Sequence, residues 1–174
     1  MKYTDRQIFD RVISHAEGFK QFPNGYYMVF VRSKEDAPDK FDDKVYLFEG
    51  RKFIDVTTCT TNSGTYGLMN FFKWNRKGTA LLKANQSYYN CWRRGMHKSR
   101  MPAWIQTLNR VIVSRDNNKN YSSDDFLNYE SGYFGINIHT VTYNSANVVR
   151  KLIGKWGVGC MVFNNTKVYR EWLK

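Results

Sequence analysis

Short apolar runs, most of them alternating with polar positions, recur along the chain between residues 26 and 163. Runs of this kind that are rich in Val, Ile, Thr and aromatic residues are typical of β-strands. They predict strands at Tyr26–Arg32, Lys44–Phe48, Lys52–Cys59, Thr79–Leu82, Ala103–Gln106, Arg110–Ser114, Gly135–His139 and Gly159–Phe163. The Glu49-Gly50-Arg51 segment between the second and third runs predicts a hairpin turn.

Three segments have helical rather than strand character. In residues 4–17, apolar side chains recur at helical spacing, behind Thr4 or Asp5 as a cap and ahead of Gly18 as a stop. Shorter helices are predicted at Asn144–Ile153 and Thr166–Leu173. The Thr-rich run at 57–68, with its Ser-Gly pair, instead predicts a strand that turns tightly into a second strand.

Length and composition favour one domain. A chain of 174 residues can bury a sizeable core, and its 17% aromatic content suits a β-rich fold. We therefore expect a mainly β fold, a single compact domain over 1–174 with mainly antiparallel strands and short peripheral helices. Within it, residues 1–25 form an N-terminal helix and turn, 26–165 the β core and 166–174 a C-terminal helix.

The charge balance changes the picture of partners. The chain has 27 Lys and Arg against 15 Asp and Glu, a formal net charge of +12. Such an excess favours polyanions: nucleic acid, an anionic cell envelope or acidic lipid headgroups. The charged N-terminus predicts no secretion signal, and no apolar run reaches the roughly 20 residues of a membrane span. We therefore expect synthesis in a cytoplasm and no membrane span.

The candidate chemistry lies in the last two strand-like runs, which carry His139 and Cys160. An imidazole can deprotonate a nearby thiol to the nucleophilic thiolate, so we expect Cys160 to ionise below the usual pKa of about 8.5. A glycine beside the sulfur frees backbone N–H groups to bind an oxyanion. The alternative is a buried cysteine and an unrelated histidine. A disulfide between Cys59 and Cys91 is conceivable only outside the cell.

No cofactor or metal is expected. No set of His, Cys and carboxylate residues has the spacing of a zinc site, and no Gly-rich phosphate loop follows a strand. The oxygen-rich segment that begins at Asp116 fails as a calcium loop, because Tyr121 stands where that loop needs glycine.

Several motifs together resemble the L,D-transpeptidase catalytic domain of bacterial cell-wall enzymes. In chain order they are Thr61-Asn62-Ser63-Gly64-Thr65-Tyr66, Ile138-His139-Thr140 and Gly157-Val158-Gly159-Cys160. The chain departs from the family pattern at Asn62, Gly157 and Val158, where that pattern has Pro, Ser and His. A phage and bacterial subgroup is more similar still, with a Phe-Gly-Ile-Asn-Ile-His segment. That subgroup also has counterparts of Arg115-Asp116, Gly95–His97 and Ala103–Gln106. The resemblance covers roughly residues 26–165.

The resemblance implies an L,D-transpeptidase-like fold and a cysteine-dependent acyl transfer or hydrolysis. Cys160 would attack a carbonyl of a peptidoglycan stem peptide, with His139 as the base. The backbone N–H groups of Gly159 and Cys160 would hold the oxyanion. Residues expected to support the site or bind substrate are Thr140, Tyr133, Asn137, His97, Arg115 and Asp116.

The partners implied are a peptidoglycan peptide as substrate and an anionic polymer of the cell envelope. A phage lysis enzyme or virion component would fit, reaching the host cell wall after lysis or inside a virion. Two other interpretations stay open. One is an inactive family member with a structural or wall-binding role. The other is a basic nucleic-acid-binding protein, which rests on composition alone.

Overall fold

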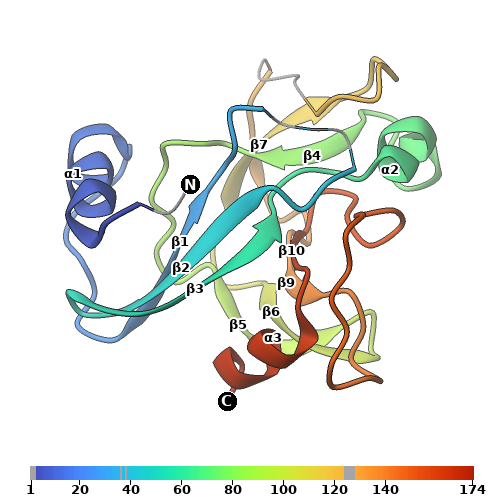
Figure 1. The fold of residues 1–174 in the computed structure, drawn as a ribbon. Coiled ribbons are helices and arrows are strands. Elements are labelled where there is room, and N and C mark those ends of the chain that lie inside the picture. Colours follow the sequence, from blue (N-terminus) through green and yellow to red (C-terminus); the bar gives the residue numbers. More distant parts are fainter. Residues whose placement is uncertain (1–2, 36, 38, 124–127) are drawn as a thin grey trace.

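A computed structural model describes residues 3–35, 37, 39–123 and 128–174. The fold is mainly β, as the alternating pattern predicted, with two sheets and short helices (Figure 1). No helix in the described part of the chain is long and apolar enough to cross a membrane.

The larger sheet has seven strands in the order β1-β2-β3-β10-β9-β6-β5. Neighbouring strands are antiparallel except β9 and β10, which run parallel. This pair brings two segments some twenty residues apart in sequence side by side in the middle of the sheet. In chain order the strands are β1 (Tyr26–Val31), β2 (Asp43–Glu49), β3 (Lys52–Thr60), β5 (Trp92–His97), β6 (Met101–Gln106), β9 (Ile138–Thr140) and β10 (Met161–Phe163).

The smaller sheet has three antiparallel strands in the order β4-β7-β8. They are β4 (Thr79–Leu82), β7 (Val111–Asp116) and β8 (Glu130–Gly132). The alternating valines of β7, Val111 and Val113, are fully buried. They share one hydrophobic core with Val45 and Phe163 of the larger sheet and with Tyr169 of the C-terminal helix.

The helices lie at the edges of the molecule (Figure 1). Helix α1 (Asp5–His15) starts with a capping box in which Thr4 and Gln7 bond reciprocally, and it buries Ile8 and Phe9 in a second apolar cluster. Helix α3 (Thr166–Trp172) is capped by Asn165 and buries Tyr169. Both confirm the predicted terminal helices to within one or two residues.

Two predicted elements are wrong. The segment after β3 does not return as a strand, because Gly64 starts the short helix α2 (Thr65–Asn70), which continues as the 3-10 turn η1 (Phe71–Lys73). The helix predicted at Asn144–Ile153 is absent from that segment, which makes isolated bridges through Val149 and Leu152. Its side chains are mostly exposed, so no apolar face holds a helix there.

Two strands were not predicted. The basic stretch at 92–100 forms β5 and the turn into β6. Its charged side chains face outward from an edge strand, so the pattern lacks the apolar alternation of a buried strand. Strand β8 has only three residues and gives no periodic signal.

Candidate active site

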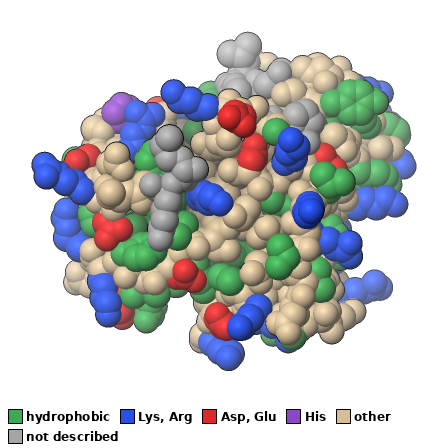
Figure 2. Space-filling view, viewed as in Figure 1, with side chains coloured by type: hydrophobic (Ala, Val, Ile, Leu, Met, Phe, Trp, Pro, Cys, Tyr) green, Lys and Arg blue, Asp and Glu red, His purple; other side chains and the backbone are tan. Residues whose placement is uncertain are grey.

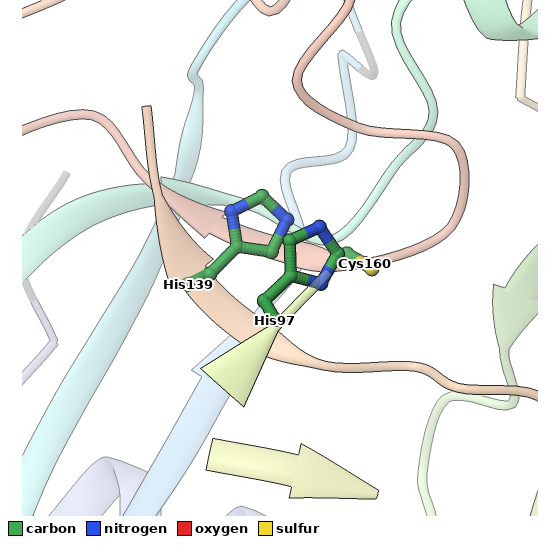
Figure 3. A group of neighbouring side chains, drawn as sticks. All are labelled: His97, His139 and Cys160. Carbon is green, nitrogen blue, oxygen red and sulfur yellow. The ribbon is translucent and has the colours of Figure 1, made fainter. Parts of the chain in front are cut away.

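Three side chains from separate parts of the sequence meet at one point of the larger sheet. His97 ends β5, His139 is the middle residue of β9, and Cys160 directly precedes β10. One ligand atom of each, a ring nitrogen or the sulfur, lies within 4.8 Å of the others (Figure 3). We call these three residues the His-His-Cys cluster. The predicted proximity of His139 and Cys160 is thus confirmed, and His97 joins them.

The parallel pairing of β9 and β10 places the histidine and the cysteine together. Met161 pairs with Ile138 in the register, and the Met161 N–H donates to the Asn137 carbonyl at 3.0 Å. The Thr140 hydroxyl donates to the Phe163 carbonyl at 3.2 Å and ties the far ends of the two strands. Continuing this register back by one residue, Cys160 lies level with Asn137, two residues before His139 on the neighbouring strand.

The glycines before Cys160 are required by close backbone contacts. Gly159 has φ +117°, and a Cβ there would lie 2.6 Å from the Ala80 carbonyl oxygen. At Gly157 a Cβ would lie 3.2 Å from the Asn62 carbonyl oxygen, and the Gly157 carbonyl accepts the Gly64 N–H at 3.0 Å. The Thr61–Gly64 segment, which is the Thr-x-x-Gly motif, therefore packs directly on the loop before β10 that carries Gly157 and Cys160.

The tautomer of His139 follows from its one hydrogen bond. Its Nδ1 lies 2.9 Å from the Thr140 carbonyl oxygen, which can only accept. Nδ1 therefore carries the proton and Nε2 has the lone pair. His139 is 1% exposed, and its Nε2 has no hydrogen-bond partner among the described residues. The site thus holds a buried nitrogen base with its lone pair unused.

His97 has the opposite tautomer. The Gln106 backbone N–H donates to Asn137 Oδ1 at 3.0 Å, which fixes the orientation of that amide. The amide Nδ2 must then donate to His97 Nδ1, 3.0 Å away. Neutral His97 therefore carries its proton on Nε2 and can donate a hydrogen bond from that nitrogen. Asn137, predicted as a supporting residue, is the group that sets this tautomer.

Both imidazoles are neutral at physiological pH. Burial lowers the pKa of His139 to about 3, with the neighbouring His97 as the next cause. Burial and the Lys98 charge lower the pKa of His97 as well. The two rings stack with centroids 4.3 Å apart and an angle of 20° between planes. Two stacked imidazoles cannot both be protonated without strong repulsion, which agrees with these directions.

The expected low pKa of Cys160 is wrong. Part of the Cys160 residue is exposed, but the sulfur is closely surrounded, and this burial raises the pKa of the thiol. The Asn137 backbone N–H and the Lys98 charge lower the pKa, but by less than burial raises it. The thiol also donates to the Gly135 carbonyl at 3.6 Å, which favours the protonated form. The physical reason is burial of the sulfur, and the neighbouring neutral imidazole offers no positive charge that would favour the thiolate.

The same three residues could be read as metal ligands, since two imidazoles and a thiolate are ligands that zinc accepts. Zinc holds its ligand atoms at bonds of about 2.0–2.3 Å in a tetrahedron, so the lone pair of every ligand must point at the metal. Imidazole lone pairs also lie in the ring planes, and two stacked, nearly parallel rings do not aim at one point. This arrangement therefore fits proton transfer better than metal binding.

Other predicted site residues lie outside the cluster. Arg115 and Asp116 are on β7 of the smaller sheet, where Arg115 pairs with Glu130 at 2.5 Å. The Tyr133 side chain is 57% exposed in the segment between β8 and β9. Thr140 supports the site through its carbonyl oxygen and its hydroxyl. The oxyanion role of the Gly159 and Cys160 N–H groups stays a prediction.

Two residues that hold the site in place were not singled out for that role. Gln106 accepts from the Phe134 and Gly135 N–H groups and so fixes the loop whose carbonyl faces the thiol. Asp43 is fully buried and accepts from the N–H and hydroxyl of Thr61. A carboxylate that opens an apolar run, as Asp43 does before Val45–Phe48, is the signal that could have indicated it.

Comparison with known proteins assigns no family: no family model matches the chain, and no curated protein or solved structure matches it either.

Proposed function

We propose that this chain is a cysteine-dependent acyl-transfer enzyme of the L,D-transpeptidase type, which acts on peptide bonds of peptidoglycan stem peptides. The observation that carries the proposal is the partly exposed Cys160 thiol within 4.8 Å of a buried imidazole whose Nε2 lone pair has no partner among the described residues. Those are the two groups that thiol-based acyl transfer needs. The motifs at 61–66, 138–140 and 157–160 support the choice of substrate.

The first half-reaction follows from the positions of these groups. The Cys160 sulfur attacks the substrate carbonyl carbon while its proton passes to His139 Nε2. The Nδ1–H of His139 keeps donating to the Thr140 carbonyl oxygen, and this hydrogen bond stabilises the imidazolium. The C–N bond then breaks, the proton moves from Nε2 to the leaving amine, and a thioester remains on Cys160. Because thiol and imidazole are both neutral at rest, proton transfer accompanies the attack rather than preceding it.

The second half-reaction returns the enzyme to its starting state. Water or a second amine attacks the thioester carbonyl, loses a proton to His139 Nε2, and the proton passes to the departing sulfur. Water gives a peptidase and an amine gives a crosslink. The Nε2–H of His97 is a donor that can face charge developing at the sulfur or the oxyanion.

The experiment is incubation of the purified chain with sacculi of several wall chemotypes, with released and crosslinked peptides identified by mass spectrometry. Cys160→Ala is expected to reduce turnover about a thousandfold or more. His15→Ala is the matched control for histidine variants, because His15 is exposed on α1. Full turnover by the Cys160→Ala protein would overturn the mechanism. Turnover that disappears with a chelator and returns with zinc would favour the metal reading of the same cluster.

A further inference from the structure

A surface of exposed aromatic rings and lysines lies beside the loop that carries Cys160. It consists of Tyr66 from α2, Phe72 from η1 and Trp74 directly after η1, together with Lys73, Lys119 and Lys155, and we call it the α2 patch. Phe72 is 54% exposed and Trp74 49%. Figure 2 shows hydrophobic and basic side chains gathered over the part of this face where α2 lies in Figure 1. Exposed apolar groups concentrated in this way mark interaction surfaces.

The lysines are placed over the rings and are not neutralised. The Nζ atoms of Lys73 and Lys155 lie 5.6 and 4.8 Å from the Tyr66 ring centroid. Lys119 Nζ lies 5.4 Å from the Phe72 ring centroid. None of the ion pairs among the described residues involves these three lysines. The patch therefore presents apolar ring surface and free positive charge together.

The patch is joined to the His-His-Cys cluster by the backbone. The Gly64 N–H bonds to the Gly157 carbonyl at 3.0 Å, and a Cβ at Gly67 would lie 3.1 Å from the same oxygen. Lys155 precedes Cys160 by five residues, a stretch of chain that spans at most about 17 Å. An extended ligand lying on the patch can therefore place a side branch at the sulfur.

Two polymers would meet the charge of the patch, an acidic glycan and a single-stranded nucleic acid. Bases bind by stacking on free aromatic faces. Here lysines occupy positions over the faces of Tyr66 and Phe72, and Trp74 meets Tyr66 edge-on at 5.9 Å between centroids. The partial ring faces that the lysines leave open suit the C–H groups of a sugar, which pack on part of a face, better than the full stacking of a base, while the lysines attract carboxylates. The arrangement favours the glycan.

We propose that the α2 patch binds the glycan strand of peptidoglycan, with its sugars on Phe72 and Trp74 and the carboxylates of its stem peptides at Lys73 and Lys155. This binding would hold a stem peptide in reach of Cys160. The inference rests on the proposed function for the identity of the polymer. It adds a substrate-binding surface outside the His-His-Cys cluster.

The binding test uses the full chain with Cys160→Ala, so that nothing is turned over. Sedimentation with sacculi is measured for Phe72→Ala/Trp74→Ala and for Lys73→Gln/Lys155→Gln. Each pair is expected to weaken binding about tenfold or more, which is 1.4 kcal/mol. Tyr26→Ala and Lys20→Gln are matched controls, because both residues are exposed and lie outside the α2 patch. Tyr26 is on β1, and Lys20 lies between α1 and β1. Thermal melts check that the variants fold.

A second arm separates this inference from the proposed function. In the active chain, both pairs of patch variants are expected to lose turnover on sacculi about tenfold. The Phe72→Ala/Trp74→Ala protein, whose changes remove only the sugar contacts, is expected to cleave a soluble stem peptide without glycan at the parent rate. Sacculus binding that is equal in patch variants and parent would overturn the inference, whatever the activity. Loss of binding to a single-stranded oligonucleotide, with sacculus binding intact, would overturn it in favour of nucleic acid. A parent that cleaves neither substrate would remove the proposed function alone, because binding is measured separately.

Discussion

Two histidines of one cluster carry their protons on opposite ring nitrogens, and neighbouring backbone groups decide which. The Thr140 carbonyl keeps the proton of His139 on Nδ1, whereas the Asn137 amide keeps that of His97 on Nε2. The first histidine can therefore accept a proton at Nε2 and the second can donate a hydrogen bond there. Sequence alone treats the two as alike, because a tautomer depends on partners that only the fold brings near.

This division predicts different responses to replacement by glutamine. A side-chain amide can donate a hydrogen bond but cannot take a proton at neutral pH. His139→Gln is therefore expected to lower kcat about a thousandfold or more, while His97→Gln is expected to lower it only about tenfold and His97→Ala further. Steady-state kinetics on a soluble stem peptide measures all three. Equal losses for the two glutamine variants would contradict the assigned roles.

The neutral state of Cys160 leads to a second prediction at this scale. Because burial raises the pKa of the thiol, the thiolate fraction is small at pH 7 and grows about tenfold for each pH unit up to that raised pKa. Alkylation by iodoacetamide should thus keep accelerating above pH 8.5. Peptide mapping by mass spectrometry should locate the label at Cys160 before Cys59 or Cys91, because those two are buried. A rate that levels off near neutral pH would show a preformed thiolate.

At the scale of elements, the site depends on two loops that pack backbone against backbone. The loop after β3 and the loop before β10 meet through Gly64, Gly67 and Gly157. A Cβ at Gly64 would lie 2.4 Å from the Gly154 carbonyl oxygen and 2.9 Å from an Asp39 carboxylate oxygen. These contacts explain physically why a Thr-x-x-Gly segment accompanies a Gly-Cys strand.

Glycine-to-alanine changes test this contact. Gly64→Ala is expected to lower the free energy of unfolding by about 2 kcal/mol or more, since backbone atoms of both loops must move apart. Gly25→Ala is the matched control, because a Cβ there meets nothing within 4 Å, and its effect should stay within about 0.5 kcal/mol. Urea denaturation measures both. Similar costs at the two positions would mean that the loops are not closely packed.

The sequence predicted strands and terminal helices well where side chains alternate or where a cap is present. Thr79–Leu82 was predicted to the residue, and Thr4, the observed cap of α1, was one of the two residues predicted for that position. Prediction from the sequence failed where tertiary contacts decide the local structure. Gly64 starts a helix because the cysteine loop and Asp39 hold its N-terminus, with the Thr65 N–H bonded to an Asp39 carboxylate oxygen. For the site, the His139–Cys160 pair was predictable from two strand-like runs. His97 was named as a supporting residue only through the family resemblance, because strand β5, which positions it, was not predicted.

At the scale of the whole molecule, burial of a neutral histidine links the site to stability. The folded-state pKa of His139 is about 3, against an ordinary value of 6.5. A group with a lowered pKa in the folded state binds fewer protons there than in the unfolded chain between these two values. The contribution of neutral His139 to the free energy of unfolding is fully present above pH 6.5 and is lost as pH falls towards 3. The shift corresponds to about 5 kcal/mol.

The final prediction compares the pH dependence of unfolding in the parent and in His139→Gln. Carboxylates titrate in the same range, but they are shared by both proteins, so the difference between the two unfolding curves isolates the histidine. The parent's advantage over His139→Gln is expected to shrink steadily from pH 6.5 to pH 3, by a few kcal/mol, because only the parent must protonate a buried imidazole. His15→Gln, an exposed change on α1, should run parallel to the parent throughout. Urea denaturation at half-unit pH steps measures this, and a constant difference between parent and His139→Gln would show that His139 is not held neutral by burial.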